Sequence, residues 1–186
     1  MDFKLIVGLG NPGEEYENTY HNAGFLFIDH LAHAAAEAKP AKRETAFSFV
    51  KTPEKILLKP LTFMNGSGGA VKAALKYFDC SPAQMLVVHD DSDIALGDFK
   101  YSFARGAAGH KGVESIMDSL PDTAFWRLRI GVRPAAAEGA RKKAGEFVLT
   151  PIGRAGQEML QEVFSNAEKT MEKLITNDAP SGPETI

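Results

Sequence analysis

The sequence predicts a single α/β domain with a mixed, mostly parallel sheet flanked by helices, a three-layer sandwich. Short apolar runs alternate along the chain with longer stretches of helical hydrophobic spacing, which is the pattern of strands joined by crossover helices. The 186 residues suit one domain, and no repeat or linker divides them. We expect the domain to span residues 1–176, with 177–186, which hold two prolines and a glycine, as a frayed tail.

In the first half of the chain, apolar runs bounded by turn residues predict strands, and apolar residues three and four apart predict helices. The first strand enters the turn sequence Gly8-Leu9-Gly10-Asn11-Pro12-Gly13, and the last one ends in Asp90-Asp91-Ser92-Asp93. We expect strands at residues 3–7, 47–51, 55–59 and 85–89, and helices at residues 24–37 and 67–78.

The second half repeats this alternation of strands and helices. A loop of small residues, Gly106-Ala107-Ala108-Gly109, separates a strand from a helix, as expected for a crossover connection. The final helix has Met159, Val163, Ala167 and Met171 on one face. We expect strands at residues 99–103 and 126–132, and helices at residues 111–120 and 152–175.

Composition excludes several classes of protein. Hydrophobic residues make up 44% and charged residues 24% of the chain, which are globular values that exclude disorder and coiled coil. No apolar run approaches the roughly 18 residues of a membrane span, and the N-terminus lacks a secretory pattern. Cys80 is the only cysteine and cannot form an internal disulfide, which suits a reducing compartment. We therefore expect a cytoplasmic monomer that does not enter a membrane.

The net charge of −3 hides an uneven distribution. The stretch 100–143 holds nine basic and four acidic residues, a balance of +5, which leaves −8 for the rest of the chain. Such asymmetry permits a local anionic partner such as a nucleic acid.

Gly8-x-Gly10-x-x-Gly13 follows a strand and formally matches the dinucleotide fingerprint. That fingerprint requires a helix N-terminus at the glycines, whereas here Pro12 interrupts it and the next segment is the acidic Glu14-Glu15-Tyr16-Glu17. We therefore favour a tight strand exit, which places Asn11 at the carboxyl end of the first strand, where open α/β sheets hold their sites.

Three other groups of residues suggest chemistry only weakly. Carboxylates at positions 90, 91, 93 and 98 could bind magnesium in a phosphotransfer enzyme, but no Walker loop accompanies them. His30 and His33 lack an acidic or cysteine partner nearby in the sequence, and Cys80 lacks an evident base. We therefore predict neither a metal site nor a cofactor.

Polar residues stand at the ends of predicted elements, where packing does not require them. They are Asn11, His21-Asn22, Asn65 and Asp90. A histidine, a carboxylate and side-chain amides together supply a base, a group that orients the base, and donors for a carbonyl oxygen.

Five motifs resemble those of the bacterial-type peptidyl-tRNA hydrolases, in the expected order over residues 3–175. The resemblance implies a single α/β domain that cleaves the ester between a peptide and the 3′ ribose of tRNA, without metal or cofactor. The motifs are Leu5-Ile6-Val7-Gly8-Leu9-Gly10-Asn11-Pro12-Gly13-x-x-Tyr16-x-x-Thr19-x-His21-Asn22-x-Gly24, Pro60-x-Thr62-Phe63-Met64-Asn65-x-Ser67-Gly68, His89-Asp90-Asp91-x-Asp93, Gly109-His110-x-Gly112 and Phe125-x-Arg127-Leu128-Arg129-Ile130-Gly131.

The resemblance also implies roles for the site residues. His21 would take a proton from the attacking water, Asp90 would orient the imidazole, and Asn11 would contact the carbonyl side of the substrate. Phe63 and Asn65 would line the subsite for the 3′ end.

Tyr16 would lie against that subsite. The resemblance places the tRNA-binding surface in the basic stretch 100–143, with Arg129 in a matching position, and it places Lys111 at a substrate-contacting position.

The chain departs from the family pattern in this basic stretch. Lys111 replaces the usual asparagine, and Ser102 stands where many relatives carry a lysine. The alternative function is therefore an RNA-binding relative with weak or altered hydrolase activity, and a magnesium phosphohydrolase built on the aspartates is a third interpretation. The intact set of Asn11, His21, Asn65 and Asp90 favours the hydrolase, because a pure RNA-binding protein would not need it.

Overall fold

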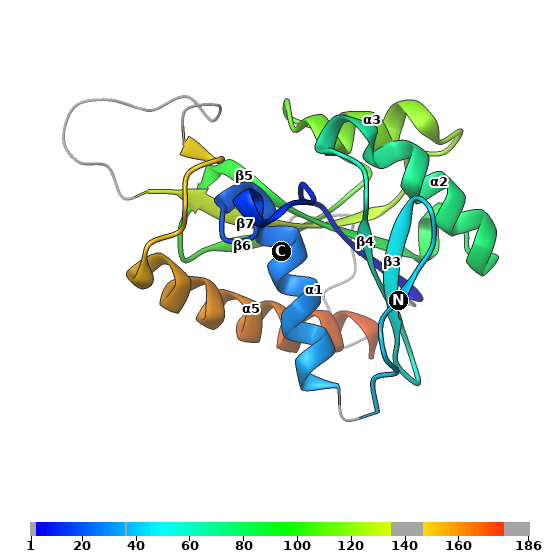
Figure 1. Cartoon of the computed structure of the whole chain (residues 1–186), viewed down its shortest axis with the longest axis horizontal. Coiled ribbons are helices and arrows are strands. Elements are labelled where there is room, and N and C mark those ends of the chain that lie inside the picture. The colour runs from blue at the N-terminus through cyan, green and yellow to red at the C-terminus, as the bar shows by residue number, and fades with distance from the viewer. Residues whose placement is uncertain (1–2, 36, 135–146, 177–186) are drawn as a thin grey trace.

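The structure is a computed structural model that describes residues 3–35, 37–134 and 147–176. The strands of the described chain form a seven-stranded sheet in the order β2-β3-β4-β1-β5-β7-β6 (Figure 1). β4, β1, β5 and β7 are parallel neighbours, while β2, β3 and β6 are antiparallel to the strands beside them. The strands are β1 (Leu5–Gly8), β2 (Lys42–Arg43), β3 (Phe47–Lys51), β4 (Ile56–Pro60), β5 (Met85–Ala95), β6 (Phe99–Phe103) and β7 (Trp126–Arg133).

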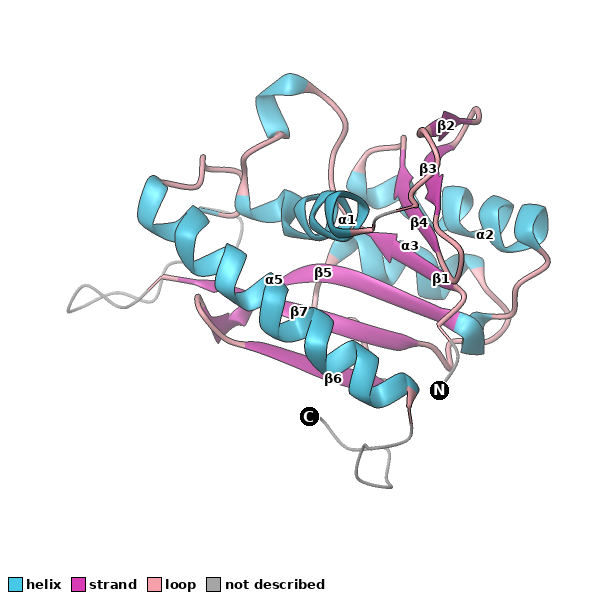
Figure 2. Cartoon of the chain, turned by 90° about the horizontal axis from the view of Figure 1, so that it is seen from below, coloured by secondary structure: helices cyan, strands magenta, loops and turns pink. Residues whose placement is uncertain are grey.

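Helices cover both faces of this sheet. On one face lie α1 (Ala23–Ala34) and α5 (Arg154–Ile175), and on the other lie α2 (Ser67–Phe78) and α3 (Lys111–Ser119) (Figure 2). Successive residues of β1 alternate between the two cores, as the strand period requires: Ile6 packs with the first helix pair, while Leu5 and Val7 pack with the second. The predicted three-layer α/β sandwich is therefore confirmed.

Close contact between β1 and α1 explains the glycines that resemble a nucleotide fingerprint. A Cβ at Gly8 would overlap the carbonyl oxygen of Gly24, and a Cβ at Gly24 would overlap the backbone of Leu9. Glycine at both positions lets the first turn of α1 lie directly on the end of β1. The turn residues of the first motif thus bring the start of α1 beside the end of β1.

The structure differs from the predicted elements at three places. The strand predicted at 85–89 continues to Ala95, because β7 keeps pairing with β5 through Asp90 and Asp91 before a bulge. The first helix ends at Ala34 rather than at residue 37. The two-residue edge strand β2 was not expected.

The remaining predicted strands and helices agree with the structure to within about two residues, the usual uncertainty of element ends. The proposed tail 177–186 lies outside the described residues. Among the helices that the structure describes, none combines the length and the apolarity needed to cross a membrane.

Candidate active site

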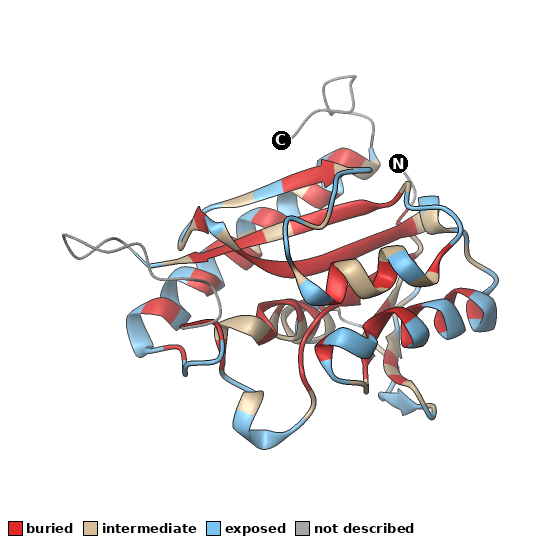
Figure 3. Cartoon of the chain, turned by 90° about the horizontal axis from the view of Figure 1, so that it is seen from above, coloured by how far each residue is buried: buried red, intermediate tan, exposed pale blue. Residues whose placement is uncertain are grey.

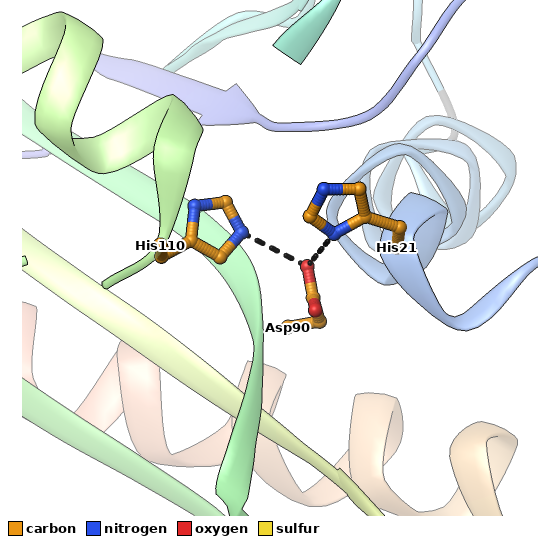
Figure 4. Close-up of side chains that lie close together, drawn as sticks. All are labelled: His21, Asp90 and His110. Carbon is orange, nitrogen blue, oxygen red and sulfur yellow. Dashed lines mark hydrogen bonds and ion pairs between the residues drawn. The ribbon is translucent and has the colours of Figure 1, made fainter. Parts of the chain in front are cut away.

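A buried carboxylate joins two imidazoles beyond the carboxyl end of β1. His21 lies in a one-turn 3-10 helix (Tyr20–Asn22) directly before α1, Asp90 lies on β5, and His110 precedes the first residue of α3. Asp90 Oδ1 is 2.8 Å from His21 Nδ1 and 2.9 Å from His110 Nε2 (Figure 4). Three segments that are distant in sequence therefore meet at one oxygen atom.

The hydrogen bonds assign the protons on both rings. The Val113 N–H donates to His110 Nδ1 at 3.3 Å, so the ring proton of His110 is on Nε2 and points at Asp90. The Nδ1–H of His21 donates to the same carboxylate oxygen, which leaves the lone pair of His21 on Nε2. The His21 side chain is 16% exposed, so water can reach the ring.

The surroundings of Asp90 favour its ionised form. Burial is the largest single influence and raises the pKa of the carboxyl, but the charges and hydrogen bonds of His110 and His21 together outweigh it. The net effect holds the pKa of Asp90 well below its usual value. Asp90 is therefore a carboxylate at neutral pH, able to stabilise a positive charge that forms on His21.

A third histidine, His89, packs against His110. His89 is buried on β5, donates from Nδ1 to the Asp90 carbonyl oxygen at 2.7 Å, and has its ring centroid 4.6 Å from that of His110. Burial, followed by the charge that His110 carries when it is protonated and by the charge of Arg127, holds the pKa of His89 well below its usual value. His89 is thus a neutral ring that packs against His110.

Asn11 is held by a contact that fixes the orientation of its side-chain amide. Its Oδ1 accepts from the Met64 N–H at 2.8 Å, and because a backbone N–H only donates, the amide NH₂ points the other way. No described residue accepts a hydrogen bond from this NH₂. Asn11 therefore presents a donor, as required for contact with a substrate carbonyl.

Asn22 fixes the backbone of Asn11. Its Oδ1 accepts from the Asn11 N–H at 2.8 Å, and its Nδ2 donates to the Asn11 carbonyl oxygen at 3.0 Å. Both side chains are buried, so these reciprocal bonds are shielded from water. Since Asn22 directly follows His21, it couples the position of the histidine to that of Asn11.

Two aromatic side chains, the half-buried Tyr16 and the exposed Phe63, form a pair near Asn11. Tyr16 and Phe63 pack edge to face with ring centroids 6.3 Å apart, and Phe63 is 59% exposed. Asn65 is exposed in the turn that precedes α2, one residue after the Met64 that bonds Asn11. The predicted 3′-end residues are thus adjacent to the predicted catalytic residues.

The two basic residues predicted to contact the substrate have acidic partners. Lys111 is 72% exposed and forms an ion pair with Glu114 at 3.0 Å, while Arg129 Nε is 2.8 Å from Asp91 Oδ2. Arg127 is only 2% exposed, and burial followed by the charge of Arg129 lowers its pKa to about 10 against the opposing effect of Asp91. The basic residues 141–143 lie outside the described part of the chain.

The predicted aspartates do not gather into one metal site. Asp91 binds Arg129, whereas Asp90 binds the two histidines. In the described ranges, the one group with metal-ligand spacing is His21, Asp90 and His110, whose ligand atoms lie within 4.8 Å of one another. A metal would require His110 Nε2 to lose its proton, and the Val113 N–H bond opposes the tautomer that this needs. The hydrogen bonds therefore favour proton transfer over metal binding.

The sequence predicted Asn11, His21 and Asp90, and the structure brings them together. It singled out Asn22 without giving it a role, and it gave no role to His110 and His89, although both stand within quoted motifs. His110 was detectable as a polar residue before a predicted helix, as Asn22 was. Their roles depend on hydrogen bonds across the fold, which sequence spacing does not contain.

A mixed α/β sandwich with an ionised carboxylate behind a water-accessible imidazole and an amide donor beside it has the parts that a hydrolytic enzyme with a general base requires. The peptidyl-tRNA hydrolase family model matches residues 5–184. Curated peptidyl-tRNA hydrolases of Aquifex aeolicus and Bordetella parapertussis are 40% and 37% identical to the chain, each over 94% of it and over 91% and 83% of their own lengths.

A crystal structure of the peptidyl-tRNA hydrolase from Acinetobacter baumannii has a TM-score of 0.82 at 30% identity, and the match covers 95% of this chain and 90% of that one. The chain belongs to the peptidyl-tRNA hydrolase family. The family and the enzyme class predicted from the sequence are therefore confirmed.

Proposed function

We propose that the chain hydrolyses the ester between a peptide and the tRNA 3′ ribose with a water activated by His21 and without a metal, so that the tRNA is recycled. The observation that carries this proposal is the orientation of His21, whose Nδ1–H is bonded to Asp90 and whose Nε2 lone pair is free to accept a proton. A base in this orientation needs no further activation.

The proposed reaction transfers one proton to His21 and back. His21 Nε2 takes a proton as the water oxygen bonds to the ester carbonyl carbon, and the negative Asp90 stabilises the imidazolium. The C–O bond to the ribose then breaks, and His21 returns its proton to the departing 3′ oxygen. An ester is a reactive acyl donor, so the mechanism needs no covalent enzyme intermediate.

The amide of Asn11 stabilises the substrate carbonyl in this proposal. Its NH₂ is directed away from Met64 by the bond to the Met64 N–H, and a donor held in place in advance stabilises developing negative charge on the carbonyl oxygen. His110 holds the second side of the Asp90 oxygen. It thereby keeps the carboxylate from rotating away from His21.

The proposed substrate enters with its 3′ end against the Tyr16–Phe63 pair and beside Asn65. The exposed ring of Phe63 offers an aromatic surface to the terminal base, and base–aromatic stacking contributes about 1–3 kcal/mol. Lys111 and Arg129 remain proposed tRNA contacts, and their present partners Glu114 and Asp91 imply that each exchanges a carboxylate for a phosphate on binding.

The test is incubation of the purified chain with an N-acetyl-aminoacyl-tRNA, followed by separation of free tRNA from the intact ester. We expect release of tRNA and of the acylated amino acid over many turnovers. Binding of the ester without its cleavage would favour the alternative function, an RNA-binding relative.

A further inference from the structure

Positive charge is concentrated in a second segment of the chain besides 100–143. Residues 39–78 hold eight basic and two acidic residues, a balance of +6. This segment runs through β2, β3, β4 and α2. It contains Phe63 and Asn65 of the proposed 3′-end subsite but has otherwise been given no function.

Four of its lysines converge on one surface, which we call the α2 basic face. It consists of Lys42 on β2, Lys51 at the end of β3, and Lys72 and Lys76 on α2, with Tyr77 among them. All five residues are exposed. Figure 3 looks onto the α2–α3 side of the sheet and shows that the outer side of α2 faces solvent.

Aromatic contacts join the strand and helix parts of this face. Lys51 Nζ lies 5.3 Å from the ring centroid of Phe78, and the Tyr77 ring packs against Phe47 with centroids 5.8 Å apart. Lys42 pairs with Phe49 in the β2–β3 ladder, so the two side chains share one side of the sheet. The end of α2 and the edge strands therefore form a continuous surface.

One carboxylate lies beside the α2 basic face, that of Glu44, and it accepts a hydrogen bond from the Tyr77 hydroxyl at 3.1 Å rather than from a lysine. None of its four lysines forms an ion pair with an acidic residue in the described part of the chain. In the stretch 100–143, Lys111 and Arg129 have carboxylate partners and Arg127 is buried, while the exposed Lys100 and Arg105 form no ion pair among the described residues. Free positive charge is what attracts a phosphate backbone, because each neutralised phosphate releases counterions.

The face begins at the proposed active site. α2 starts at Ser67, two residues after Asn65, and Lys72 and Lys76 lie about 8 and 14 Å further along the helix at about 1.5 Å per residue. An RNA strand whose 3′ end lies against the Tyr16–Phe63 pair can therefore pass along these lysines. Protection of an exposed edge strand explains only Lys42, and a favourable interaction with the helix dipole explains only Lys76. Neither explains Lys51 and Lys72.

We infer that the α2 basic face binds the phosphate backbone of the tRNA part of the substrate, as a second contact surface outside the ester-cleaving site. This inference rests on the proposed function, because it takes the RNA to be the tRNA of that reaction. The surface recognises phosphate charge and therefore discriminates between long and short substrates rather than between sequences.

The test compares the double variant Lys72→Glu/Lys76→Glu with a matched control, Lys169→Glu/Lys173→Glu. The control lysines are exposed on α5, on the opposite side of the sheet, and have the same spacing. Each variant is assayed with full-length N-acetyl-aminoacyl-tRNA and with a trinucleotide ester that ends in the same 3′ adenosine. The neutral variant Lys72→Gln/Lys76→Gln replaces the Glu variant if thermal unfolding shows that the latter has not folded.

We expect the α2 variant to raise KM for full-length substrate by about tenfold or more and to reduce the salt slope of tRNA binding by about one to two. Its kcat, its cleavage of the short ester and both activities of the control should stay at wild-type values. An α2 variant that behaves like the control with full-length substrate would overturn the inference. An α2 variant that loses affinity for anionic phospholipid vesicles but keeps its affinity for tRNA would also overturn the inference.

The two proposals fail in different ways. A wild-type chain that cleaves neither ester refutes the proposed function. Its affinity for uncharged tRNA then tests the surface directly. Tighter binding by wild type than by the α2 variant still supports the surface, and equal binding overturns it.

Discussion

Replacing Asp90 with asparagine tests the role of the carboxylate with little change in shape. Asp90→Asn keeps an oxygen that can accept one hydrogen bond but removes the negative charge that faces His21 and His110 at 2.8 and 2.9 Å. It also places an amide NH₂ in the site, which can donate to His21 Nδ1 and turn the imidazole into the wrong tautomer. Both effects oppose formation of the imidazolium in the transition state.

The loss follows from the geometry of the ion pair. Opposite charges centred about 4 Å apart attract by about 4 kcal/mol at an effective dielectric constant of about 20. Because His21 is partly exposed, we take somewhat less than this value. At about 1.4 kcal/mol per factor of ten, kcat should fall by about 10²–10³-fold. KM should change little, because the charge on His21 develops only in the transition state.

The assay is steady-state cleavage of N-acetyl-aminoacyl-tRNA, with Asp98→Asn as the control because that aspartate is exposed outside the cluster. The control should retain the wild-type kcat. A kcat for Asp90→Asn within about threefold of wild type would refute the argument that Asp90 stabilises charge on His21.

Three further predictions concern the surroundings of this pair. Asn22→Ala leaves the buried N–H and C=O of Asn11 unpaired, so urea denaturation should show that the free energy of unfolding falls by about 2–4 kcal/mol, and cleavage should be slower. The control is Asn18→Ala, which alters an exposed asparagine. Equal stability of the two variants would contradict the coupling between Asn22 and Asn11. His89 has a lower pKa folded than unfolded, so its stabilising effect is complete above pH ~6.5 and declines by up to ~1.4 kcal/mol per pH unit below that. His89→Gln should flatten this decline and His33→Gln should not, and parallel pH profiles of wild type and His89→Gln would refute the assignment. Finally, kcat should survive dialysis against a chelator, and a loss that zinc or magnesium restores would instead assign the His21–Asp90–His110 group to a metal.

The sequence predicted the layers of the fold because each layer has a local signature. Apolar runs and helical spacing located the central strands and the four α-helices of the described residues. β5 was predicted too short because polar residues after an apolar run usually mark the end of a strand. Here Asp91 is instead accommodated within the sheet by Arg129 on the neighbouring strand β7.

The catalytic pair was predictable, but its supporting contacts were not. His21 and Asp90 stand out as polar residues at element ends within recognisable motifs. The role of His110 requires that the N-terminus of α3 meet β5, and the role of Asn22 requires that the start of α1 lie on the end of β1. Such contacts arise from packing between segments far apart in the sequence.

Charge counting located positive stretches but not free positive charge. Arg129 and Lys111 contribute to the balance of 100–143, yet in the structure each has a carboxylate within 3.0 Å. Lys72 and Lys76 have no such partner among the described residues. Pairing depends on side-chain positions, so only the structure separates neutralised charges from those open to a ligand.

The central claim is that His21 is the base for hydrolysis of the ester, and the cleavage rate of His21→Ala tests it most directly. Wild type and the control His33→Ala, which alters an exposed histidine on α1, should cleave N-acetyl-aminoacyl-tRNA at equal rates. His21→Ala should bind uncharged tRNA with wild-type affinity and show no cleavage above the uncatalysed rate. Turnover by His21→Ala near the wild-type rate would contradict the claim.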